Sequence, residues 1–153
     1  MKIEEELKTE NFESNYHKVT LNILFTANWI KERLKVCTDK EKITLQQYNI
    51  LRILRGQYPH PTTSNLIKER LLDKMSDVSR LIDRLVQKGL VSRSISTVDR
   101  RAVDILLTKK GFESLKKLDE PMKTSAVLNQ NLSQEECEIL NNLLNKIRDK
   151  RKE

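Results

Sequence analysis

A short amphipathic helix that runs directly into two strands is the feature that most constrains the fold of this chain. The helix carries four apolar residues at the i, i+3, i+4 and i+7 positions of one face, which are Val78, Leu81, Ile82 and Leu85. Gly89 follows, and glycine commonly ends a helix. The segments "LVSRSI" (90–95) and "AVDILL" (102–107) then predict two short strands. A helix followed at once by a hairpin is typical of a winged helix-turn-helix.

Two helices and a short third one are predicted before this unit. A long amphipathic helix ends near Cys37, and a second helix opens with a capping box of Thr44 and Gln47. The prolines in "QYPHPTT" break the chain, after which Thr62 or Thr63 can cap a third helix.

Two more helices are predicted after the hairpin. One extends from Thr108 to about Leu128, and the last opens with a capping box of Ser133 and Glu136. The element order is therefore α-α-α-α-β-β-α-α. Only three glycines and three prolines occur, which agrees with long regular elements. The predicted fold class is mainly α (α+β), a winged helix-turn-helix with long N- and C-terminal helices.

Composition limits the classes of function. The 29 Lys and Arg residues against 22 Asp and Glu give a net charge of +7, which favours a polyanionic partner or a membrane surface. No apolar run reaches the ~18 residues of a spanning helix, and "MKIEEELKTE" is acidic where a signal peptide is basic. We therefore expect a cytoplasmic protein without membrane contact.

Catalytic and metal chemistry find no support in the sequence. Cys37 and Cys137 do not form a metal-binding spacing with His17 and His60. No nucleophile and base pattern or glycine-rich phosphate loop occurs. We expect a protein that is not an enzyme and that uses no cofactor or metal.

The helix before Gly89 offers a polar face that could read DNA. With its apolar residues inward, Ser76, Arg80, Asp83 and Gln87 point outward, with Ser79 and Arg84 on the shoulders. The first turns of such a helix lie deepest in the major groove, so Ser76, Ser79 and Arg80 carry the most weight. The alternative is an ordinary solvated face on which Asp77 pairs with Arg80. Against it, Arg80 and Arg84 are like charges at i,i+4, which favours an anionic partner.

The predicted hairpin tip in "TVDRRAVDILL" contains one acidic residue, Asp99, followed by two adjacent basic residues, Arg100 and Arg101. A basic tip can enter the minor groove, where arginine is favoured. Asp99 could accept guanidinium hydrogen bonds and preset an arginine for binding. The alternative is a solvated charged turn.

The stretch "DKMSDVSRLIDRLVQKGLVSRSISTVDRRAVDILLTKKG" resembles the recognition helix and wing of the MarR family of transcriptional regulators. The resemblance rests on "RLIDRL", "QKGLV", the Asp-x-Arg pattern at Asp99 and Arg101, and "LT..G" ending at Gly111. It implies a homodimer that binds double-stranded DNA at an inverted-repeat operator, usually represses, and is released by a small aromatic or lipophilic effector. By the family pattern, Arg101 enters the minor groove with Asp99 as its partner, which leaves Arg100 for phosphate. The predicted DNA-binding residues are Thr63, Ser76, Asp77, Ser79, Arg80, Arg84, Asp99, Arg100 and Arg101.

The terminal helices fit the same interpretation. The first helix carries a second apolar stripe of Leu21, Leu24, Phe25 and Trp29 that a winged domain cannot cover alone. We expect one domain over 1–153, with the DNA-binding region at 44–111 and dimerisation helices at 10–40 and 112–153. A two-fold dimer would place its two reading helices roughly 34–36 Å apart, one turn of DNA, or a multiple of it. A monomeric helical core is the alternative.

Effector and redox roles stay open at this point. Tyr16, Trp29, Tyr48 and Phe112 could line an effector cleft, but a core position is the stronger expectation for each. Cys37 and Cys137 could sense oxidants or be ordinary thiols. The alternative functions are a nonspecific or architectural DNA-binding protein and a winged-helix protein-interaction module. The ratio of specific to nonspecific DNA affinity distinguishes a sequence-specific regulator from these alternatives.

Overall fold

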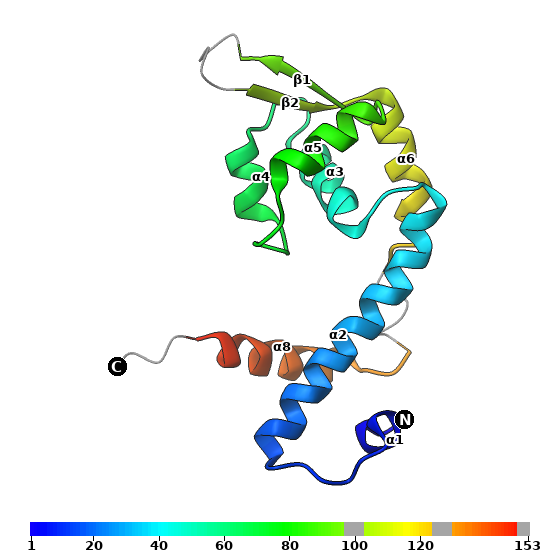
Figure 1. The fold of residues 1–153 in the computed structure, drawn as a ribbon, viewed down its shortest axis with the longest axis vertical. Coiled ribbons are helices and arrows are strands. Elements are labelled where there is room, and N and C mark those ends of the chain that lie inside the picture. Colours follow the sequence, from blue (N-terminus) through cyan, green and yellow to red (C-terminus); the bar gives the residue numbers. More distant parts are fainter. Residues whose placement is uncertain (97–102, 124–129, 150–153) are drawn as a thin grey trace. The chain divides into compact units, whose positions relative to one another are not determined.

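The computed structural model describes residues 1–96, 103–123 and 130–149, which fall into two compact units, Met1–Leu118 and Asp119–Glu153. The elements of the chain, labelled in Figure 1, are α1 (Ile3–Leu7), α2 (Asn15–Lys40), α3 (Leu45–Gln57), α4 (Ser64–Arg70), α5 (Val78–Gln87), β1 (Val91–Ile95), β2 (Val103–Leu107), α6 (Lys109–Asp119) and α8 (Gln134–Arg148). The predicted mainly helical fold is confirmed: three short helices are followed by a two-stranded hairpin, as in a winged helix.

The predicted helix starts are the most accurately placed features. At the start of α3, the Thr44 hydroxyl accepts a hydrogen bond from the Gln47 N–H at 3.2 Å, and the Gln47 side chain binds the Thr44 N–H in return. Thr63 is the cap of α4, since its hydroxyl accepts from the Leu66 N–H at 3.3 Å. The capping box of Ser133 and Glu136 opens α8. These polar side chains satisfy backbone N–H groups that have no partner within the helix.

One whole helix and the ends of two others differ from prediction. Helix α1 is not predicted at all, because five residues are too few to show a helical repeat. In the structure its Ile3 side chain is buried, and Glu4 forms an ion pair with Lys18 of α2. Helix α2 continues to Lys40, beyond Cys37. Helix α6 ends at Asp119 rather than near Leu128, because Pro121 disfavours the helical conformation of the residue before it.

The hairpin is tied to the helices by backbone hydrogen bonds. Strands β1 and β2 are antiparallel, with Arg93 opposite Ile105. Thr62, in the α3–α4 connection, exchanges two backbone hydrogen bonds with Ile105, at 3.0 and 2.9 Å. This bridge fixes the inner strand of the wing to the start of α4 (Figure 1).

The turn into α6 explains the "LT..G" motif. The Thr108 hydroxyl donates to the Gly89 carbonyl at 2.8 Å and accepts from the Gly111 N–H at 3.1 Å. Gly111 packs so tightly that a Cβ atom there would lie 2.3 Å from the Leu90 carbonyl oxygen. Gly89 adopts φ +70°, a left-handed conformation that glycine reaches without strain. Both glycines are therefore required by the backbone.

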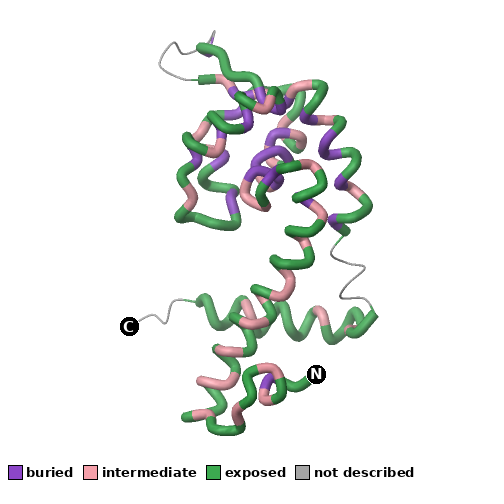
Figure 2. The backbone as a smooth tube through the Cα atoms, turned by 45° about the vertical axis from the view of Figure 1, so that its right-hand side comes forward, coloured by how far each residue is buried: buried purple, intermediate pink, exposed green. Residues whose placement is uncertain are grey.

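The hydrophobic core belongs to the winged region. The fully buried side chains cluster in α3, α4, α5, β2 and α6, where Figure 2 shows most of the buried backbone; the largest apolar ones are Ile50, Leu51, Ile67, Leu71, Ile82, Leu85, Ile105, Leu115 and Leu118. In contrast, α8 has no buried residue, and Thr38 is the only one in α2. Within the described part of the chain, no helix is both long and apolar enough to cross a membrane.

Candidate nucleic-acid interface

Helix α5 has one buried apolar face and one exposed polar face. Val78, Ile82 and Leu85 are buried, and they hold the helix against the core. Leu81, which the sequence pattern places inward, is only half-buried. The exposed residues of the helix are Ser79, Arg80, Asp83, Arg84, Val86 and Gln87. The outward face is thus polar and carries two arginines, as predicted from the apolar spacing.

Asp77 is the N-cap of α5 rather than a member of its exposed face. Its carboxylate accepts a hydrogen bond from the backbone N–H of Arg80 at 3.1 Å. The Asp77–Arg80 pair of the alternative interpretation, a solvated helix face, is therefore a hydrogen bond from the Arg80 backbone and not an ion pair with its guanidinium group. A carboxylate at this place also interacts favourably with the positive end of the helix dipole.

Ser76 lies before the helix and already has a partner. Its hydroxyl donates to the Asp73 carboxylate at 3.0 Å, and the Met75 N–H donates to the same carboxylate at 3.1 Å. Both hydrogen bonds stabilise the ionised Asp73 carboxylate, and they hold the pKa of Asp73 below its ordinary value. The bond from the Ser76 hydroxyl has the larger effect and the bond from the Met75 N–H the smaller. The stability that these bonds give the α4–α5 connection is present at neutral pH and is lost as the pH falls through the lowered pKa of Asp73. Ser76 can still accept a hydrogen bond, so Ser79 and Arg80 are the stronger candidates to donate one to DNA.

An ion pair that the sequence analysis did not anticipate links the helix to the wing. Arg93 of β1 binds the Asp83 carboxylate of α5 at 2.7 Å. Because both side chains are about half exposed, the pair contributes at most about 1 kcal/mol to stability. Its geometric effect is to fix β1 against α5 and to occupy Asp83, which leaves the arginines as the charged groups of the exposed face. No local periodicity marks this pair, since it depends on how the hairpin packs.

The remaining predicted site residues fall in two places. Thr63 caps α4 and is adjacent to Thr62, which bridges to β2, whereas Asp77 caps α5. Asp99, Arg100 and Arg101 lie outside the described residues. The structure therefore places Ser76, Asp77, Ser79, Arg80 and Arg84 in or directly before α5, and Thr63 at the start of α4.

The aromatic residues do not behave as one group. Tyr48 is buried, and Trp29 and Phe112 are half-buried. Phe112 packs edge-to-face on Tyr58, with ring centroids 5.0 Å apart. Tyr16 is 87% exposed, so the expected core position of this residue is wrong. Cys37 and Cys137 are not joined in a disulfide, and both are partly exposed.

Comparisons with known proteins agree with this geometry. The family model of the MarR family matches residues 43–103. The repressor MdtR of Bacillus subtilis is 32% identical over 94 residues, which cover 61% of this chain but only 58% of MdtR. The crystal structure of a MarR transcription factor from Planctomyces limnophilus is 30% identical, with a TM-score of 0.65 over 90% of this chain and 98% of that chain.

A DNA complex has the same fold. A cysteine-to-serine mutant of E. coli MarR, crystallised with operator DNA, is 22% identical, with a TM-score of 0.76 over 92% of this chain and all of that chain (100%). The family model covers the helix-turn-helix and the first strand, and the match to the Planctomyces protein extends over nearly the whole chain. The chain belongs to the MarR family of winged-helix transcriptional regulators.

Proposed function

We propose that this protein is a sequence-specific, DNA-binding transcriptional regulator that binds an inverted-repeat operator as a homodimer and represses transcription until a small effector releases it. The observation that carries the proposal is the exposed face of α5, where Ser79, Arg80 and Arg84 stand on a helix anchored by three buried residues. The relative MdtR is named as a repressor, and the E. coli relative was crystallised with operator DNA; both support the proposal.

In the proposed complex, the first turns of α5 enter the major groove. Ser79 and Arg80 would contact base edges there, and an arginine bound to guanine through two hydrogen bonds discriminates by about 1–3 kcal/mol. The wing would place Arg101 in the minor groove, braced by Asp99, with Arg100 on phosphate. Thr63 and Arg84 would contact the phosphate backbone, Ser76 would accept a hydrogen bond from a base amino group, and Asp77 would support binding by capping α5. Such a role needs no catalysis, and we expect the protein in the cytoplasm with its DNA.

Substituting Ser79 or Arg80 by alanine tests the reading helix. We expect each variant to change the preference at particular base pairs, because a base contact is lost, while the affinity for other sequences changes less. The measurement is selection from a randomised duplex pool with each purified variant. Gln87→Ala is the matched control on the same helix, because Gln87 is exposed at the C-terminal end of α5, away from the first turns that enter the groove. Recovery of the wild-type sequence by both test variants would remove Ser79 and Arg80 from base recognition.

Homodimer formation is supported by exposed apolar side chains on α8 and on α2. On α8, a single face carries Ile139, Leu140, Leu143 and Ile147, which are 43% to 60% exposed. On α2, Val19 and Leu24 are at least half exposed. Contiguous apolar surface of this kind commonly marks an interface between chains, and a two-fold interface uses the same patch on both subunits.

Introducing two lysines into the apolar face of α8 tests the dimer. The double variant Leu143→Lys and Ile147→Lys should be a folded monomer at ~10 μM, where the wild type is a dimer, because an interface core does not accept two unpaired cations. Light scattering after size-exclusion chromatography gives the mass, and circular dichroism reports the fold. Asn141→Lys, which adds a charge to the opposite side of α8, should remain dimeric. A monomeric wild-type protein, or a dimeric double variant, would contradict the proposed interface.

A further inference from the structure

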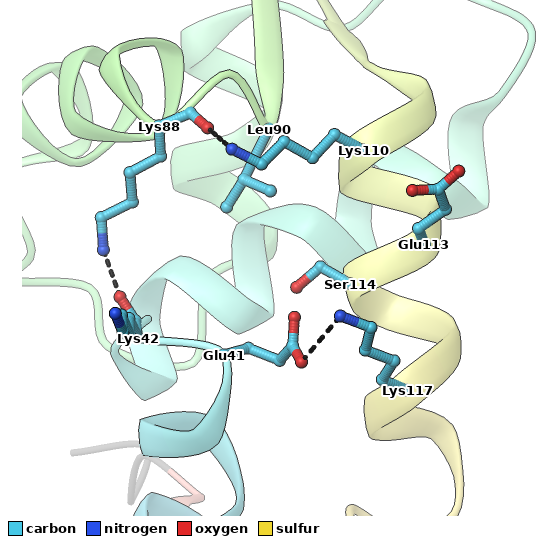
Figure 3. Close-up of a pocket in the computed structure, with 8 residues that line it drawn as sticks. All are labelled: Glu41, Lys42, Lys88, Leu90, Lys110, Glu113, Ser114 and Lys117. Carbon is cyan, nitrogen blue, oxygen red and sulfur yellow. Dashed lines mark hydrogen bonds and ion pairs between the residues drawn. The ribbon is translucent and has the colours of Figure 1, made fainter.

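The hydroxyl of Ser114 is an unexplained polar group inside the winged region. Ser114 lies on α6 and is 4% exposed, and its oxygen has no hydrogen-bond partner among the described residues. Leaving a buried hydroxyl unpaired costs free energy, so such a group in a native protein requires a reason. In Figure 3 this oxygen points into a cavity of about 400 Å³ that lies between α6 and the segment joining α2 to α3.

The walls of this cavity, which we call the lysine pocket, are strongly basic. They comprise Glu41, Lys42, Lys88, Leu90, Lys110, Glu113, Ser114 and Lys117 (Figure 3). Four lysines against two glutamates leave an excess of two positive charges. Glu41 is already paired with Lys117 at 3.3 Å, and Figure 3 shows the Glu113 carboxylate turned away from the Ser114 hydroxyl. The pocket therefore favours a negatively charged occupant.

Two of the lysines are held in place by backbone carbonyl groups. The Lys110 ammonium donates to the Lys88 carbonyl at 2.7 Å, and the Lys88 ammonium donates to the Lys42 carbonyl. A carbonyl oxygen is neutral, so these bonds orient the cations without cancelling their charge. Each ammonium group has three donors, so each has capacity left for a ligand. Lysine is well suited to bind phosphate and carboxylate as a point charge.

We propose that the lysine pocket binds a small organic anion that carries carboxylate or phosphate groups, with the Ser114 hydroxyl donating a hydrogen bond to it. The cavity volume falls within the range of small-molecule sites, roughly 300–1,000 Å³. Its charged lining distinguishes this ligand from the aromatic or lipophilic effector that the family resemblance implies. Lys88 caps the C-terminal end of α5, so a bound anion would touch the proposed reading helix directly. Binding itself does not depend on the proposed DNA-binding function and is measured without DNA.

The test is thermal unfolding and titration calorimetry of the full chain with sodium citrate and with sodium pyrophosphate, each against sodium chloride of equal ionic strength. We expect at least one anion to raise the Tm beyond the chloride control and to bind with a saturable Kd. Citrate alone would identify a carboxylate ligand, and pyrophosphate alone a phosphate ligand. A Tm that follows ionic strength alone with both anions would overturn the proposal.

Matched variants assign the binding to the pocket. Lys110→Gln and Ser114→Ala should each weaken the Kd at least five-fold, whereas Lys116→Gln, an exposed lysine of the same helix outside the pocket, should leave it unchanged. Without anion, Ser114→Ala should unfold at the wild-type Tm or above it, because it removes an unpaired buried hydroxyl. Lys117→Gln replaces Lys110→Gln if the latter does not fold. Equal Kd values for the pocket variants and Lys116→Gln, or a lower Tm for Ser114→Ala with an unchanged Kd, would contradict the assignment.

Discussion

Replacing Gly111 by alanine is expected to lower the free energy of unfolding by about 3 kcal/mol, the upper part of the usual range for overpacking a core. The added Cβ would lie 2.3 Å from the Leu90 carbonyl oxygen and 2.7 Å from Leu107 Cδ1. The first of these neighbours is backbone, so the start of β1 or of α6 must move. Urea unfolding followed by circular dichroism measures the loss.

Gly56→Ala is the matched control for this substitution. Gly56 lies near the end of α3, and a Cβ there would have no neighbour within 4 Å. Alanine is the better helix former, so this variant should gain up to about 1 kcal/mol. Equal stabilities of the two variants would show that the close packing at Gly111 does not control the fold.

Replacing Arg101 by alanine is expected to lower operator affinity ten-fold or more while the dimer stays folded. The proposal places this side chain in the minor groove, where the negative potential is strongest, so its loss removes a charge-assisted contact. Fluorescence anisotropy with a labelled operator duplex, taken from the selection described below, measures the affinity.

The neighbouring Arg100→Ala variant separates the two wing arginines. A residue that contacts only phosphate should weaken binding to all sequences about equally and reduce the salt dependence of binding. Arg101→Ala should in addition reduce the discrimination between operator and unrelated DNA. Unchanged operator affinity in Arg101→Ala would rule out the proposed role of the wing.

Local signals explain which parts of the fold were predictable. The caps at Thr44, Thr63 and Ser133 satisfy backbone groups within three residues of themselves, so sequence alone is sufficient to locate them. The inward face of α5 followed from helical spacing, apart from the half-buried Leu81. The predicted end of α6 near Leu128 is wrong, because Pro121 disfavours a helical conformation in the residue before it and the helix ends at Asp119.

Long-range contacts explain what the sequence could not predict. Helix α1 depends on the burial of Ile3 and the contact of Glu4 with Lys18, neither of which a five-residue segment reveals. The Asp83–Arg93 pair requires the hairpin to pack beside α5. The lysine pocket combines side chains from α6, from the end of α5 and from the α2–α3 connection, which only the folded chain brings together. In the candidate interface, sequence therefore identified the exposed helix face but not the tertiary contacts that position it.

The most direct test of the proposed function is selection from a randomised duplex pool at ~150 mM salt, followed by sequencing of the DNA that the purified wild-type protein retains. A sequence-specific dimer should enrich an inverted repeat whose half-sites lie about 10 base pairs apart, one helical turn. DNA retained without any enriched sequence would contradict the proposal and would indicate nonspecific backbone binding. Failure to retain any DNA would contradict it as well, and would assign the exposed face of α5 to another kind of partner.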